Sequence, residues 1–367
     1  MGNEDVRILV LDDSVESRRA LSDVVAAMPR TVLEGASAPS DAAFSRMRLG
    51  SVDIVLVPAQ SGLDTIRKIR ARSLQVGVIL ISDAEENQAR LTLDALDEGA
   101  LGFVKRSAGW KPGDGHADLV RQIFPLICAY QARRSVKLIR ESAAAAPTSR
   151  LTPGHSDDLA SRLRNPINLV AVGISTGGPE TLSTLFRGMP ETLGVPMLVV
   201  QHMPPVFTRT LAGRLNQISS LDVREAAQGD TVTSDSVLIA PGGRHMTVVR
   251  EYGLGATTGP LAIRLTDTPP VHACRPSVDV LFQSLADQAV RGVLAVVMTG
   301  MGSDGCSGVR ALKKHGAYCI TQDEESCVVY GMPRAVDEAG LSDERVQLPH
   351  LASRIARLVK QTRPFRS

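Results

Sequence analysis

Short, continuous runs of apolar residues recur along this chain and alternate with segments of helical periodicity. Read in order, the strongest runs occupy 7–11, 53–57, 76–81, 101–105, 169–172, 195–200 and 292–298. Runs of this length without polar alternation are typical of parallel strands buried on both faces. Their alternation with helical segments predicts an α/β protein in which helices cover parallel sheets.

A stretch of different character separates the first four runs from the others. Residues 133–146 continue as a basic helix, whereas 147–158 are rich in turn formers and lack periodicity, which is typical of a flexible linker. A chain of 367 residues is long enough for two domains. We therefore expect an α/β domain at 1–130, a linker at 131–165 and a doubly wound parallel-sheet (Rossmann-like) domain at 166–367.

The composition restricts the class of function. Lys and Arg number 41 against 39 Asp and Glu, and only 3% of residues are aromatic, so neither a basic surface nor a base-stacking platform is indicated. No apolar run approaches the roughly 18 residues that cross a bilayer, and no apolar signal segment follows the charged N-terminus. The five cysteines form no C-x-x-C pair, as expected of reduced thiols. We expect a cytoplasmic protein that is not membrane-embedded and does not bind nucleic acid.

A glycine-rich turn follows the apolar run at 169–172. Its sequence, Gly173-Ile-Ser-Thr-Gly-Gly-Pro179, places Ser175 at the apex of a strand–turn–helix elbow. A serine at such an elbow projects its hydroxyl out of the sheet, beside helix N–H groups that can stabilise an oxyanion. The structural alternative is a glycine-rich turn that contains an incidental serine.

Two more polar side chains follow strands of the same domain. His202 lies just beyond the run at 195–200, and Asp304 lies in the glycine-rich turn after 292–298. The carboxyl ends of parallel strands meet at one edge of a sheet, with neighbouring strands about 4.8 Å apart. A nucleophile, a base and an orienting carboxylate need contacts of about 2.6–3.2 Å, which strand-end loops can provide. The order Ser, His, Asp differs from that of the α/β-hydrolases.

Polar residues also follow the strands of the first domain. Asp12 and Asp13 come after the first strand, and Ser82 and Lys105 come after two later ones, where ligands of parallel sheets bind. Over about the first 110 residues this layout resembles the receiver domain of response regulators, a flavodoxin-like fold. The resemblance implies an Mg²⁺-binding pair in Asp12 and Asp13, a switch hydroxyl in Ser82 and a phosphate-neutralising Lys105.

The phosphoacceptor aspartate of receivers has no counterpart here. Pro58 stands in its slot at the end of the third strand and accepts no phosphoryl group. Asp53 lies about 16 Å away at the other end of that strand, and Asp64 follows a loop. Loss of one carboxylate should weaken the Mg²⁺ site, because Mg²⁺ needs several oxygens in octahedral geometry. We expect a pseudo-receiver that is not phosphorylated on aspartate, whose role is structural, autoinhibitory or in docking.

Several segments of the second domain carry a specific resemblance. They are 174–180, 200–205, 240–246, 275–282, 299–305 and 328–334. Together with the preceding receiver and linker, they resemble the chemotaxis protein-glutamate methylesterase (CheB) family. The resemblance implies hydrolysis of glutamate γ-methyl esters on chemoreceptors by Ser175, His202 and Asp304, without a metal or cofactor. Main-chain N–H groups near Thr176 and Met301 are the implied oxyanion hole.

The resemblance also bears on partners and on rival functions. Methyl-accepting chemoreceptors are the implied partners, and a chemotaxis kinase or adaptor is compatible with the receiver. Receptor-glutamine deamidation is a second activity of the family. Two other classes stay open: a non-catalytic receptor-binding scaffold with two docking domains, and a glutaminase-type amidase that acts on another protein. The intact Ser175, His202 and Asp304 favour an enzyme.

Overall fold

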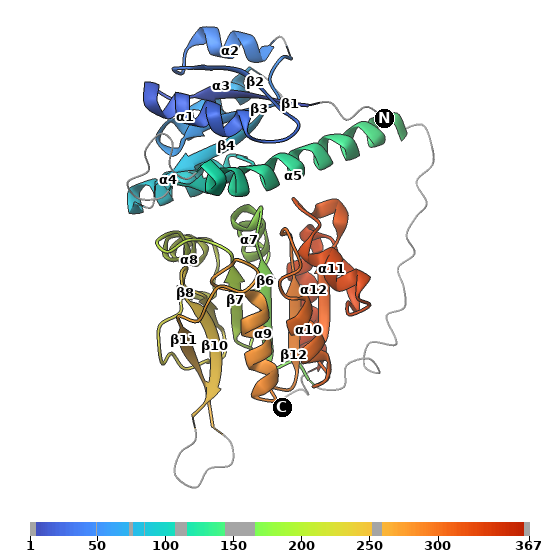
Figure 1. The fold of residues 1–367 in the computed structure, drawn as a ribbon. Coiled ribbons are helices and arrows are strands. Elements are labelled where there is room, and N and C mark those ends of the chain that lie inside the picture. The colour runs from blue at the N-terminus through green and yellow to red at the C-terminus, as the bar shows by residue number, and fades with distance from the viewer. Residues whose placement is uncertain are drawn as a thin grey trace. The chain divides into compact units, whose positions relative to one another are not determined.

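The computed structural model of the chain consists of two compact units, Met1–Ser149 and Arg150–Ser367. The structure describes residues 5–48, 50–72, 76–83, 85–106, 116–143, 166–251 and 259–362. Each unit is built on its own parallel sheet (Figure 1). Within the described ranges, no helix is both long and apolar enough to span a membrane.

The first unit alternates strands and helices. Its strands are β1 (Val6–Leu11), β2 (Thr31–Ser37), β3 (Ile54–Pro58), β4 (Gly77–Ser82) and β5 (Gly102–Lys105). Its helices are α1 (Val15–Ala26), α2 (Asp41–Arg48), α3 (Ala59–Ala71), α4 (Glu86–Asp97) and α5 (His116–Ala143). All pairings are parallel, in the order β2-β1-β3-β4-β5. This is the flavodoxin-like order, so the fold predicted for the first domain is confirmed.

The core of the first unit explains which strands the sequence revealed. β1, β3 and β4 are almost completely buried, and α1 and α5 pack on one face of the sheet through residues such as Leu21 and Ile123. The edge strand β2 was not predicted. Glu34 and Gly35 interrupt its apolar run, and pairing with β1 holds it in the sheet. Tertiary contacts therefore decide its structure rather than its own pattern.

Helix α5 extends beyond the predicted end of the first domain. It continues to Ala143, so the first part of the predicted linker at 131–165 is helical. The remainder of that linker, 144–165, lies outside the described residues.

The second unit contains a larger parallel sheet and a separate hairpin. The strands of the sheet are β6 (Leu169–Ile174), β7 (Met197–Gln201), β8 (Asp222–Glu225), β9 (Ser236–Ile239), β12 (Val293–Val297), β13 (Tyr318–Gln322) and β14 (Glu344–Val346). The hairpin pairs β10 (His245–Arg250) with β11 (Leu261–Thr266). The helices are α7 (Gly178–Arg187), α8 (Phe207–Ile218), α9 (Val278–Asp287), α10 (Cys306–Lys313), α11 (Met332–Glu338) and α12 (Leu348–Thr362), with a 3₁₀ turn at Glu324–Ser326.

The order of this sheet determines where a site can form. It runs β14-β13-β12-β6-β7-β9-β8 with parallel pairings, as predicted for a doubly wound domain. The first strand of this sheet along the chain is β6. Strands β7, β8 and β9 lie on one side of it, with β9 between β7 and β8, and β12, β13 and β14 follow on the other side. Direction reverses at β6, and ligands of such sheets bind at the crevice beyond this point. Helices α9 and α10 and the hairpin cover one face of the sheet (Figure 1).

Candidate active site

Ser175 lies between the end of β6 and the start of α7. Its N–H donates to the carbonyl oxygen of Thr299 at 2.9 Å. Gly177 adopts a left-handed φ of 76°, and a Cβ there would lie 2.2 Å from the Val328 side chain. Only glycine fits this turn, because the left-handed conformation and the close approach both exclude a side chain. The elbow predicted from the sequence is therefore present.

His202 and Asp304 meet beside this elbow. His202 directly follows β7, and Asp304 lies in the loop that leads from β12 to α10. Their Nε2 and Oδ2 atoms are 2.7 Å apart, and the side chains are 10% and 1% exposed. Two residues that are distant in sequence thus form a short hydrogen bond that is shielded from water. The position of both residues just after parallel strands predicted this contact.

The carboxylate of Asp304 is held by several donors. Its Oδ1 accepts from Ser277 Oγ at 2.9 Å and from Asp279 N at 2.8 Å, and its Oδ2 accepts from Val278 N at 2.7 Å besides His202. Burial raises the pKa of Asp304, but the hydrogen bonds from His202 and from the first turn of α9 outweigh it and lower the pKa below its usual range. An ionised carboxylate therefore faces the imidazole.

Asp304 in turn changes the pKa of His202. Burial of the ring lowers its pKa, but the hydrogen bonds with Asp304 and with Cys274 outweigh this effect and raise the pKa of His202 to about 9. Asp304 is the partner that carries a charge at neutral pH, so we assign the shift to it. An imidazole in this setting is a ready proton donor and must lose a proton before it acts as a base.

The predicted hydrogen bond between the Ser175 hydroxyl and His202 is not formed in the described part of the chain. Catalytic hydrogen bonds of unliganded enzymes are often long and tighten when substrate binds. Gly300 lies against Ser175, since a Cβ at Gly300 would be 2.7 Å from the serine Cβ. Ser175 is thus closely packed between the segments that follow β6 and β12.

The peptide between Ser175 and Thr176 is fixed from one side. The Ser175 carbonyl accepts from Gly178 N at 2.8 Å and from Gln201 Nε2 at 2.9 Å. The C=O and N–H of a trans peptide point in opposite directions, so these donors direct the Thr176 N–H away from them. That N–H has no partner among the described residues.

The peptide between Gly300 and Met301 is fixed in the same way. The Gly300 carbonyl accepts from Gly331 N at 3.0 Å and from Met332 N at 2.8 Å. The Met301 N–H therefore points the other way, and it too lacks a partner in the described ranges. Unpaired, immobilised N–H groups beside a serine are the components of an oxyanion hole.

Two further histidines lie near this site. His245 is fully buried; its Nδ1 accepts from Ser277 N and its Nε2 donates to the Pro269 carbonyl, both at 3.2 Å. These contacts give His245 a structural role in the segment that precedes α9. His272 Nε2 lies 2.9 Å from Asp279 Oδ2. Sequence reasoning missed the contact between Ser277 and Asp304, because this contact depends on the tertiary position of α9.

One group of side chains has the composition of a metal site. His272, Asp279 and Asp304 place one potential ligand atom each within 4.8 Å of one another. Both oxygens of Asp304 already accept two hydrogen bonds each. They have no free lone pair directed at a cation, so the donor set does not fit a metal ion.

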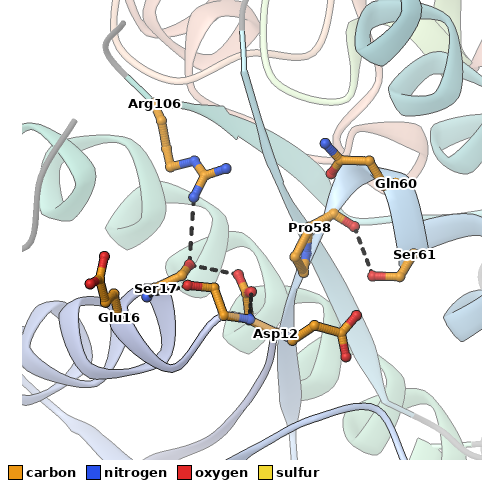
Figure 2. Close-up of a pocket in the computed structure, with 9 residues that line it drawn as sticks. Asp12, Glu16, Ser17, Pro58, Gln60, Ser61 and Arg106 are labelled. Carbon is orange, nitrogen blue, oxygen red and sulfur yellow. Dashed lines mark hydrogen bonds between the residues drawn. The ribbon is translucent and has the colours of Figure 1, made fainter. Parts of the chain in front are cut away.

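The first unit contains a cavity of about 520 Å³. Its lining consists of Asp12, Asp13, Ser14, Glu16, Ser17, Pro58, Gln60, Ser61 and Arg106 (Figure 2). Pro58 ends β3, and α3 starts at the next residue. The slot in which receivers carry their phosphoacceptor is thus occupied by the proline ring, with a helix directly behind it.

Acidic and basic side chains share this cavity. Asp12 is buried and accepts from Ser17 Oγ at 2.6 Å, whereas Asp13 is exposed. Figure 2 shows Arg106 directed at Ser17, with Nη1 at 3.5 Å from the hydroxyl. The same guanidinium binds both oxygens of Asp83 at 2.9 Å. The guanidinium therefore reaches Asp12 only through Ser17, and its charge is paired with Asp83.

The other receiver residues lie elsewhere. Ser82 is fully buried and accepts from Thr92 Oγ1 at 3.1 Å. Lys105 pairs through its main chain with the Gln122 side chain. Neither is among the described residues that line the cavity.

The two remaining acidic candidates, Asp53 and Asp64, do not line the described cavity either. Asp53 forms an ion pair with Arg7 at 3.0 Å, near the start of β3. Asp64 is exposed on α3 and is not in the cavity lining that the structure describes.

The fold and the site define a class. A flavodoxin-like domain precedes a doubly wound domain in which serine, histidine and aspartate follow three adjacent strands, which is the organisation of a two-domain hydrolase.

Comparison with known proteins identifies the family. The model of the CheB methylesterase family matches residues 170–355. A protein-glutamate methylesterase/protein-glutamine glutaminase of Desulfotalea psychrophila is 34% identical, over 97% of this chain and 99% of the relative. A protein of the same name from Nocardioides sp. is 38% identical, over 98% of this chain and 97% of the relative. The crystal structure of the Thermotoga maritima CheB methylesterase catalytic domain is 36% identical, covers 53% of this chain and 99% of that one, and gives a TM-score of 0.49. The chain belongs to the CheB methylesterase family and is an enzyme.

Proposed function

We propose that this protein hydrolyses the γ-methyl esters of glutamate side chains on chemoreceptors. The single observation that supports this most is the buried 2.7 Å hydrogen bond between His202 and Asp304, directly beside the Ser175 elbow. The names of the full-length relatives point to the same ester. The non-catalytic scaffold does not require an ionised carboxylate held by four donors.

The residues act in a fixed order in this proposal. Ser175 Oγ attacks the γ-carbonyl carbon of the ester while His202 takes the serine proton, and Asp304 stabilises the resulting imidazolium. The oxyanion of the tetrahedral intermediate accepts hydrogen bonds from the N–H groups of Thr176 and Met301. His202 then donates its proton to the departing methanol, which leaves a γ-glutamyl ester on Ser175.

Water completes the cycle. His202 takes a proton from a water molecule that attacks the acyl-enzyme, and returns a proton to Ser175 as the glutamate carboxylate leaves. General acid–base catalysis of this kind contributes about 10²–10⁴-fold. Each oxyanion donor adds about 10²–10³-fold. No step needs a metal ion.

A second activity, deamidation of receptor glutamines, needs no additional group. Ammonia leaves an amide only after protonation, and the imidazolium that forms when His202 takes the serine proton lies 2.7 Å from Asp304 and can supply that proton. The same nucleophile and oxyanion donors serve both reactions. The relatives carry both activities in their names.

The first unit is, in this proposal, a pseudo-receiver that binds Mg²⁺ weakly and is not phosphorylated on aspartate. Pro58 at the acceptor slot supports this view, as do the hydrogen bonds that both oxygens of Asp12 already accept from Ser14 N and Ser17 Oγ. A chemotaxis kinase or adaptor would then act on this unit by docking, without phosphoryl transfer to an aspartate.

Methanol release tests the proposed reaction. The purified chain is incubated with chemoreceptor carrying radiolabelled methyl groups, and volatile label is counted. We expect release by the wild type and at least 10³-fold slower release by Ser175→Ala, since loss of the nucleophile removes the covalent step. A wild type that binds the receptor but releases no methanol supports the scaffold. Equal rates for both proteins exclude Ser175 as nucleophile.

A further inference from the structure

Gln201 connects the proposed nucleophile to the proposed base. It is the last residue of β7 and is 2% exposed. Its Nε2 donates to the carbonyl of Ser175 at 2.9 Å and to that of its neighbour His202 at 3.2 Å. Both acceptors are carbonyl oxygens, so the amide orientation follows from the chemistry of its neighbours. One side chain thus holds the main chain of both residues.

The other end of this amide has no partner. Gln201 Oε1 is buried and accepts no hydrogen bond in the described part of the structure. A Cβ at Gly178 would lie 1.7 Å from this oxygen, so only glycine leaves room for it. A buried unpaired oxygen is unfavourable, and an apolar side chain of the same length would avoid that penalty. The two bonds that Nε2 donates offset this penalty, so the amide stabilises the fold less than two fully satisfied hydrogen bonds would.

The effect of the amide is on the Ser175–Thr176 peptide. Gly178 N and Gln201 Nε2 anchor the two lone pairs of the Ser175 carbonyl. Anchoring that oxygen directs the unpaired Thr176 N–H away from it. Oxyanion donors act through geometry that exists before the reaction begins, so a peptide free to tilt loses part of its contribution.

We propose that Gln201 is a positioning residue that sets the direction of the Thr176 oxyanion donor and couples Ser175 to His202. This inference rests on the proposed ester hydrolysis. Gln201 contacts neither the substrate nor the reacting atoms. It acts through the Ser175 carbonyl and through the main chain of His202.

The test replaces the amide without shortening the side chain. Gln201→Met removes the donor and the unpaired oxygen together. We expect kcat for methanol release to fall about 10-fold to 100-fold, less than the loss of a whole oxyanion donor. KM should change less than about 2-fold, because the ground-state contacts stay. Rates are compared at equal folded fraction, because the His202 carbonyl loses its donor and the melting temperature should fall. Gln201→Glu keeps the shape, but an ionised carboxylate only accepts hydrogen bonds and cannot donate to the two carbonyl oxygens, so this variant should be no more active than Gln201→Met.

Thr321→Val is the matched control. Thr321 is fully buried in β13, with its hydroxyl bonded to Asp337 and Ser342. It should lower the melting temperature and leave kcat unchanged. An unchanged kcat in Gln201→Met, or a fall that matches only its unfolded fraction, overturns the inference.

A second readout separates this inference from the proposed reaction. A fluorophosphonate reacts with an activated serine and mimics the tetrahedral oxyanion without any receptor substrate. Slower labelling of Ser175 in Gln201→Met supports the positioning role even if the wild type releases no methanol, whereas an equal rate overturns it. A wild type inert in both assays overturns the inference together with the proposed reaction.

Discussion

The Nε2 atom of His202 lies 2.7 Å from the Oδ2 atom of Asp304, in a pair that is almost completely shielded from water. The carboxylate is ionised because hydrogen bonds from His202 and from the first turn of α9 lower its pKa. Asp304 in turn raises the pKa of the imidazole. We therefore expect this contact to set the pH range of the enzyme.

The first prediction concerns pH. Ester hydrolysis needs neutral His202 as the base, and the pKa of His202 in the folded protein is raised to about 9. We expect kcat/KM for methanol release to rise with pH, to reach half of its maximum near pH 9 and to level off above that pH. The measurement is a pH–rate profile from 5.5 to 10, with circular dichroism to verify folding. A midpoint near 6.5, the ordinary histidine value, would contradict the influence of Asp304.

The second prediction concerns Asp304→Asn. The amide keeps the size of the carboxylate and removes its charge, so the imidazolium loses its stabilising partner. We expect kcat to fall by about 10³–10⁴-fold, as in other enzymes with such a group. The midpoint of the pH profile should move below that of the wild type. A retained midpoint would show that another group raises the pKa of His202. Asp267→Asn, at an exposed ion pair with Arg244, serves as the control.

The third prediction uses glycine at the strand ends. In Gly300→Ala the new methyl group would meet Met332 Sδ at 2.4 Å and Ser175 Cβ at 2.7 Å. Displacement of the nucleophile by a fraction of an ångström should lower kcat by about 10²-fold. Gly213→Ala, in α8 with open space around the position, is the control. It should keep full activity and gain about 0.5–1 kcal/mol in unfolding free energy by urea titration.

The fourth prediction concerns the first unit. Incubation with acetyl phosphate and Mg²⁺ should leave the mass of the intact protein unchanged, because Pro58 fills the acceptor slot and Asp53 is bound to Arg7. Intact-protein mass spectrometry at neutral pH measures this directly. A stable phosphoryl adduct that disappears in Asp64→Asn would show that this aspartate replaces the acceptor.

Much of the fold could be predicted from the sequence, because buried parallel strands are continuous apolar runs. The strand ends also located Ser175, His202 and Asp304. Strands with weaker patterns were missed: β2, interrupted by Glu34 and Gly35, acquires its structure from β1.

Buried polar contacts were less accessible to sequence reasoning. Ser82 lies where the sequence put it, at the end of β4, but its hydroxyl is bound by Thr92 from α4 and does not line the cavity. The roles of Ser277 and Gln201 depend on which segments pack against them. A pattern along one segment carries no information on a partner from another.

The anchoring of Asp304 by α9 links local order to chemistry. Val278 and Asp279 at the start of that helix donate two of the four hydrogen bonds to the carboxylate. Fraying of this single helical turn would free the aspartate to rotate and deprive the imidazolium of its counter-charge. Hydrolysis at the full rate therefore requires that the first turn of α9 stays intact.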